Sequence, residues 1–94
     1  MKLDARTLIR ARVTRNLGVL SPAKHPTEIH PEHDLTADLK LSRTLRRALA
    51  PGFQKIVRHW NHTGRFTMEE CDQLSTVQEC LEMIHEKAGY PENA

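Results

Sequence analysis

The stretch SRTLRRALAPGFQKIVRHW, residues 42–60, contains the clearest structural signal in the chain. Its apolar residues recur at steps of four, four, three and four positions: Leu45, Leu49, Phe53, Ile56 and Trp60. This spacing stays close to the helical period of about 3.6 and keeps its phase across Pro51-Gly52. Two helices running in unrelated directions would not need to stay in phase. We therefore predict one kinked helix, or two nearly coaxial pieces, with Ser42 as N-cap and Pro51 in the first turn of the second piece.

A first helix is predicted near the N-terminus. Ile9, Val13 and Leu17 recur at four-residue steps, with arginines on the other faces. Gly18 is expected to end this helix, because glycine readily takes the left-handed conformation found at helix ends.

Two capping signals predict the remaining helices. Thr67 and Glu70 have the spacing of a capping box and predict a short helix that ends near Leu74. The next signal is either Ser75 with Gln78 or Thr76 with Glu79, and it predicts a last helix that closes at Gly89.

Between the first two helices, residues 20–41 contain three prolines and no helical period. We expect a long ordered loop, held by Ile29, Leu35, Leu39 and Leu41 pointing inward. Ordered loops of this length are uncommon in small domains and usually have a function.

Length and composition favour one small all-α domain. The 94 residues are 38% hydrophobic but only 4% aromatic, which favours a thin aliphatic core between helices. We assign residues 1–88 to this single domain and residues 89–94 to a flexible tail. No apolar run approaches the roughly 20 residues that span a bilayer, and the N-terminus lacks the apolar segment of a signal peptide. A monomeric cytoplasmic protein is expected.

The order of these motifs resembles the acyl carrier protein family. The similar segments are Leu17-Gly18-Val19, DLTADLKL (34–41), Glu69-Glu70 and Leu74-Ser75-Thr76-Val77. The similarity extends from Val13 to His85. It implies a four-helix bundle with a long loop after the first helix and a short third helix. It also implies an Asp-Ser-Leu motif at the start of the second helix, whose serine bears a phosphopantetheine arm.

The chain departs from the family at that motif. Laying residues 38–41 on it places Ser42 on the aspartate, Arg43 on the attachment serine and Thr44 on the leucine. Arginine cannot accept the arm, so we expect no cofactor. Phosphopantetheine on Ser42 would require the register to slip by one residue.

The second helix also departs from the family in charge. Residues 1–47 hold ten Lys/Arg against five Asp/Glu, a formal +5, and residues 48–94 hold four against seven, a formal −3. The resemblance implies an acidic docking face on this helix, but here the outward residues are basic: Arg43, Arg46, Arg47 and Arg58. Like charges repel, so a partner with an acidic docking surface is expected in place of a standard fatty-acid synthase component.

The sequence thus predicts a non-enzymatic protein–protein interaction module alongside an acyl-transfer or biosynthetic system. A functional acyl or peptidyl carrier modified on Ser42 is the alternative, and a small DNA-binding helical protein is the third hypothesis. Nucleic-acid binding is disfavoured by the net charge of only +2 and by the acidic last helix.

Histidines and cysteines suggest little further chemistry. His59 and His62 have a ligand-compatible spacing, and His30 and His33 share the long loop, but no third ligand is fixed by the sequence. We predict no metal site. Cys71 and Cys80 are expected to be reduced and partly buried. Phe53, Trp60 and Phe66 are expected to fill the interior in which carriers shelter an acyl chain.

Overall fold

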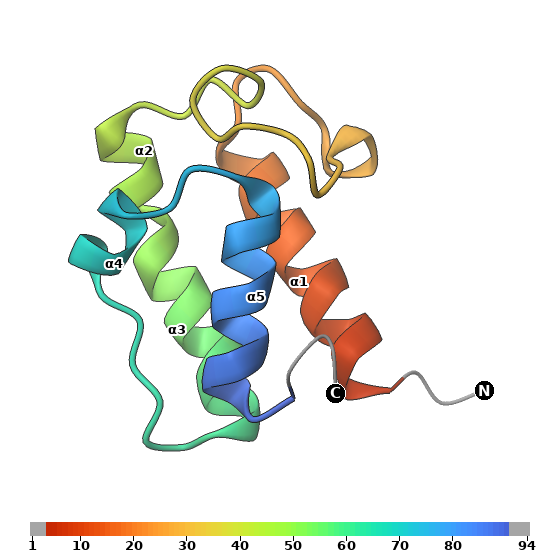
Figure 1. Ribbon diagram of the computed structural model, residues 1–94, viewed down its shortest axis with the longest axis vertical. Helices are drawn as coiled ribbons and strands as arrows, with labels where there is room; N and C mark the ends of the chain where they lie inside the picture. The colour runs from red at the N-terminus through yellow and green to blue at the C-terminus, as the bar shows by residue number, and fades with distance from the viewer. Residues whose placement is uncertain (1–3, 91–94) are drawn as a thin grey trace.

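The computed structural model describes residues 4–90, and this range contains helices but no β-strand (Figure 1). In chain order they are α1 (Ala5–Leu20), a 3-10 helix η1 (Pro26–Glu28), α2 (Arg43–Arg47), α3 (Leu49–Trp60), α4 (Met68–Asp72) and α5 (Val77–Ala88). A single isolated β-bridge joins Asp34 to Thr76 within this range. The all-α prediction is confirmed.

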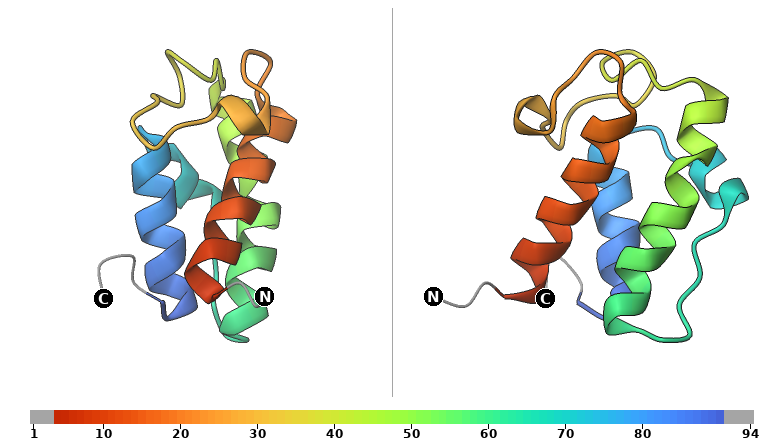
Figure 2. Two further views of the ribbon diagram at one scale, coloured as in Figure 1. Left: turned by 90° about the vertical axis from the view of Figure 1, so that its right-hand side faces the viewer. Right: turned by 180° about the vertical axis from the view of Figure 1, so that it is seen from behind.

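Helices α1, α3 and α5 pack against one another and enclose the core (Figures 1 and 2). Short α4 lies beside α2 and α3, and the loop after α1 crosses one end of the bundle. The core side chains come from every α-helix except α2, and from the connecting segments; the largest are Phe53, Ile9, Leu17, Leu35, Leu39, Leu41, Leu49, Leu81 and Ile84. No helix between residues 4 and 90 is long and apolar enough to cross a membrane.

Helices α2 and α3 are the two pieces predicted for residues 42–60. They meet at Ala48, which is the C-cap of α2 and the N-cap of α3. Pro51 lies in the first turn of α3, where its missing N–H leaves the carbonyl of Arg47 without its helical donor. This missing bond accounts for the break, while the apolar stripe stays on the inner side. The prediction for this segment is confirmed.

The predicted end of the first helix is wrong. Helix α1 continues through Gly18 to Leu20, and the amide of Ser21 donates to Leu17 O at 2.9 Å. Gly18 is required for space instead: a Cβ added there would lie 2.6 Å from the Pro26 backbone nitrogen and against its ring. Sequence alone could not reveal this contact, because Pro26 reaches α1 only through the fold of the loop.

The long loop is ordered as predicted. Leu35, Leu39 and Leu41 are buried, and Ile29 is partly buried against the same core. The Ser21 hydroxyl donates to Leu39 O at 2.6 Å, and the Leu35 amide donates to Ser75 O at 2.8 Å. These bonds join the loop to the end of α1 and the start of α5.

Both predicted capping boxes are present. Thr67 with Glu70 begins α4, and Thr76 with Glu79, not Ser75 with Gln78, begins α5. Gly89 ends α5 with φ 87°, the left-handed conformation expected there. Of the predicted tail, residues 91–94 lie outside the described residues.

Candidate functional site

The start of α2 is the region that the sequence singled out, and its geometry begins with the Ser42 cap. The amide of Leu45 donates to the Ser42 hydroxyl oxygen at 3.2 Å, while Ser42 itself is exposed. The preceding residues are fixed, because Leu41 is buried and its amide donates to Leu35 O at 2.9 Å. Ser42 therefore has a fixed structural role at the surface, as predicted.

The DLTAD segment before it is a turn stabilised by its two aspartates. Asp34 Oδ1 accepts from the amides of Thr36 at 2.8 Å and Ala37 at 2.7 Å, and Asp38 Oδ2 accepts from the amide of Asp34 at 2.7 Å. The hydrogen bonds from Ala37 and Thr36 lower the pKa of Asp34. These carboxylates thus shape the approach to α2.

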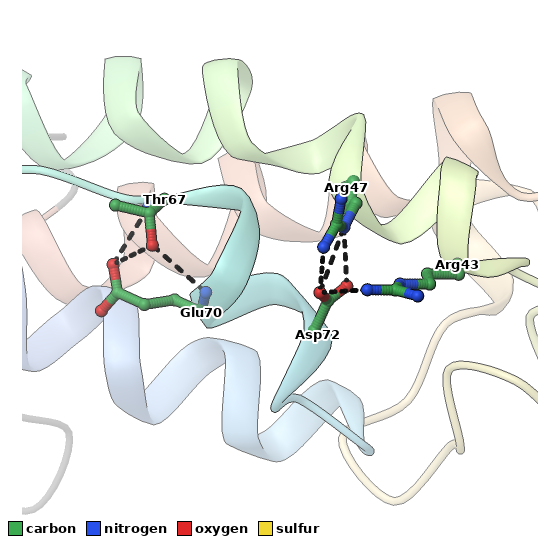
Figure 3. Close-up of polar contacts among 5 residues, drawn as sticks. All are labelled: Arg43, Arg47, Thr67, Glu70 and Asp72. Atoms are coloured by element: carbon green, nitrogen blue, oxygen red, sulfur yellow. Dashed lines mark hydrogen bonds and ion pairs between the residues drawn. The ribbon is translucent and has the colours of Figure 1, made fainter.

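Two of the predicted docking arginines converge on one carboxylate of α4 (Figure 3). Arg47 contacts Asp72 through both Nη2, at 2.7 Å, and Nε, at 3.1 Å, while Arg43 Nη2 lies 3.5 Å from the same carboxylate. The hydrogen bond from Arg47 is the largest cause that lowers the pKa of Asp72; partial desolvation opposes it. The contact ties α2 to α4 and offsets part of the positive charge on α2.

The other two arginines point elsewhere. Arg46 turns back onto the loop, where Nη1 donates to Thr36 Oγ1 at 2.7 Å and its buried Nε finds no partner among the described residues. Arg58 lies near the end of α3 and donates from Nε to Gly64 O at 2.9 Å. The structure brings Arg43 and Arg47 together but does not gather all four arginines around one point.

An open groove of about 810 Å³ lies between α2–α3 and the start of α4. Its walls are mostly apolar, with a charged group at each side; they include Ala48, Pro51, Phe66, Met68, Arg47 and Glu69. The wall from α4 is held by the Thr67–Glu70 capping box (Figure 3) and by an ion pair of 2.7 Å between Glu70 and Lys87. The groove lies next to the Asp72 contact.

The three aromatic residues expected in the interior do not all lie there. Phe53 and Phe66 are buried and meet edge to face with ring centroids 5.2 Å apart. Trp60 lies at the edge of the core, where the Arg12 guanidinium sits 5.3 Å from its ring centroid. Two of the three thus fill the interior.

The histidine and cysteine candidates stay separate. Within residues 4–90 no three His, Cys, Asp or Glu side chains form a group that could hold a metal ion. Cys71 and Cys80 are both free and buried. Burial raises the pKa of Cys71 to about 11 and raises that of Cys80 as well, so neither is an activated nucleophile.

Asp72 is the residue near this site that the sequence reasoning missed. The sequence did contain a signal for this ion pair, because no Asp or Glu occurs between Asp38 and Glu69 and the short helix that follows is acidic.

No known protein family, curated protein or solved structure matches the chain.

Proposed function

We propose that this chain is an acyl-carrier-like interaction module that lacks the phosphopantetheine arm. In this proposal the protein is no enzyme. It docks through the basic side of its second helix onto an acidic surface of a partner protein, in association with an acyl-transfer or biosynthetic system. The docking arginines are Arg43, Arg46, Arg47 and Arg58.

The order of the elements supports the carrier-like part of the proposal. A long first helix, an ordered loop, a second helix, a one-turn helix and a last helix follow one another as the resemblance implies, although the second helix is interrupted at Ala48. The loop also ends at the start of α2, where the family places its attachment motif.

The observation that carries the proposal is the position of Arg43. Ser42 is the N-cap, and Arg43 is the first residue of α2, with its guanidinium directed at Asp72. This favours the register in which Ser42 replaces the motif aspartate and Arg43 replaces the motif serine. A guanidinium cannot form the phosphodiester that attaches the arm.

Docking is supported by the exposure of Arg43, whose side chain is 69% exposed although it touches Asp72. One carboxylate serves two guanidinium groups there, so a positive charge remains for a partner. Exposed ion pairs are weak, so carboxylates of a partner can compete with Asp72 for Arg43.

Intact-mass measurement tests the central claim. The protein is incubated with coenzyme A and a broad-specificity phosphopantetheinyl transferase, and we expect no gain in mass. The matched variant Ser42→Asp/Arg43→Ser restores an Asp-Ser pair in the inferred register while keeping a capping side chain at position 42. Modification of this variant alone would support a carrier scaffold that has lost its attachment site.

A functional carrier modified on Ser42 is the second candidate, favoured by the exposure of that hydroxyl. It predicts a gain of one phosphopantetheine by the unaltered chain. Ser42→Asp would abolish this gain without removing the helix cap. That result would overturn the proposal.

A further inference from the structure

Helices α1 and α3 contribute basic side chains to one shared surface of the molecule. No Asp or Glu occurs in the sequence from residue 5 to 27 or from residue 39 to 68, so both helices are free of acidic residues. They lie side by side, with α5 packed behind them in the view from the back (Figure 2, right). A cleft between them is lined by Arg12, Arg15, Asn16, Gly52, Lys55 and Ile56.

Close approach of the two helices forms the floor of this cleft. A Cβ added to Gly52 would meet the end of the Asn16 side chain, so the glycine leaves room for that amide between the two helices. The Asn16 amide is held in turn by its bond to Arg12 O at 3.0 Å. Ile56, almost fully buried, supplies an apolar base.

The cations around the cleft differ from the arginines of α2. Arg43 and Arg47 share Asp72, whereas Arg15 and Lys55 are exposed and make no ion pair or hydrogen bond within residues 4–90. Arg12 lies over the Trp60 ring, which fixes its side chain without neutralising its charge. Three cations from two rigid helices thus face one cleft with no carboxylate in its lining.

We propose that this cleft binds an acidic segment of another protein, with carboxylates against Arg12, Arg15 and Lys55 and one apolar side chain over Ile56. The charge of the cleft calls for an anionic occupant, and its apolar base favours a peptide over a bare polyanion. Duplex DNA is disfavoured because three cations in a short cleft contact few phosphates. The inference goes beyond the proposed function and does not depend on the carrier resemblance, since the cleft is lined by none of the four proposed docking arginines.

Fluorescence anisotropy tests the proposal with labelled short peptides in which Glu and Asp flank one Leu or Phe. Peptides with Gln and Asn in place of the acids serve as controls. We expect only the acidic peptides to bind, with affinity falling at least about tenfold between roughly 20 mM and 300 mM salt. Amide shifts in a ¹⁵N spectrum should centre on Arg15, Asn16, Gly52 and Lys55.

Matched variants locate the site. Arg15→Glu/Lys55→Glu should weaken peptide binding at least about tenfold. Lys40→Glu/Arg65→Glu changes the net charge equally, at exposed residues that do not line the cleft. This variant should change affinity less than about threefold. Circular dichroism verifies folding, and the milder Arg15→Gln/Lys55→Gln replaces the first variant if it fails to fold.

Several outcomes would overturn this inference: no binding by any acidic peptide at low salt, equal loss in both charge variants, or tighter binding of duplex DNA. Self-association in sedimentation, abolished by Glu82→Lys, would also overturn it. In that case the occupant is a second copy, which presents Glu79, Glu82 and Glu86 along α5. Arm transfer to Ser42 with intact peptide binding would instead remove the proposed function and leave this inference standing.

Discussion

Asp72 shows how one residue can decide how much positive charge a helix presents. It accepts hydrogen bonds from Arg47 and Arg43, which come from α2, while Asp72 itself ends α4. Together with the Thr67–Glu70 capping box and the Glu70–Lys87 ion pair, this contact stabilises the position of a five-residue helix that is too short to be stable alone. The side of α2 that forms the candidate docking surface therefore also connects α2 to α4.

We predict that Asp72→Asn lowers stability more at neutral pH than in acid. Because the pKa of Asp72 is lowered in the folded chain, its stabilising effect is fully present above the ordinary pKa of about 3.9 and is lost as pH falls through the folded value. Urea midpoints of the variant and the unaltered chain should differ at pH about 7, and this difference should be smaller at pH about 3.

Glu86→Gln is the control for this prediction, since it removes an exposed carboxylate of α5 that makes no ion pair within the described residues. It should leave the difference in midpoint near zero at both pH values. An Asp72→Asn effect that persists unchanged in acid would show that the ion pair is not its cause.

Two glycines in helices should respond differently to alanine. A Cβ on Gly18 meets the ring and backbone of Pro26, whereas a Cβ on Gly52 meets only the movable end of the Asn16 side chain. We expect Gly18→Ala to lower the free energy of unfolding by about 1–3 kcal/mol. For Gly52→Ala the change should stay within about 1 kcal/mol, because the helix propensity of alanine offsets part of the crowding. Chemical denaturation measures both; equal losses would contradict the assigned role of Pro26.

At the scale of elements, each α-helix begins at a local feature that the sequence displays. Side-chain caps begin α1, α2, α4 and α5, and a glycine ends α5. The break between α2 and α3 follows from Pro51, a purely local effect. The sequence therefore predicts the bounds of a helix well where a neighbouring residue sets them.

The start of α5 gives a direct test of a helix cap, because the sequence left two neighbouring residues, Ser75 and Thr76, as candidates for the N-cap. Thr76 accepts from the amide of Glu79 at 3.2 Å, while the Ser75 side chain is exposed and caps nothing. Thr76→Ala should lower the free energy of unfolding by about 1 kcal/mol. Ser75→Ala should change it by less than about 0.5 kcal/mol. Urea titration compares the two, and the reverse order would place the cap on Ser75.

For the whole molecule, the sequence predicted the helices and the inward loop residues but not the contacts between distant segments. The apolar stripe of residues 45–60 and the capping boxes depend only on residues that are close together in the sequence, and the predictions made from them were confirmed. The contact of Gly18 with Pro26, the pairing of Asp72 with Arg47 and the cleft around Lys55 depend on which helices become neighbours. Charge counts located the basic half of the chain but could not distinguish paired from unpaired cations.

The two thiols offer a test of how far the fold behaves as one unit. Cys71 lies in short α4, which packs mainly against α2 and α3, whereas Cys80 lies in α5 at the centre of the bundle. Both are buried and their pKa values are raised, so a thiol reagent reaches them only when the chain opens.

We predict that Cys71 reacts with iodoacetamide at least about tenfold faster than Cys80 under native conditions, because local opening of α4 requires less free energy than global unfolding. Mass spectrometry of digested peptides follows each site, and the variants Cys71→Ala and Cys80→Ala isolate each thiol. In concentrated urea the two rates should become similar. Equal rates under native conditions would show that α4 opens only when the whole core unfolds. The contact of Asp72 with α2 would then be as stable as the helix bundle itself.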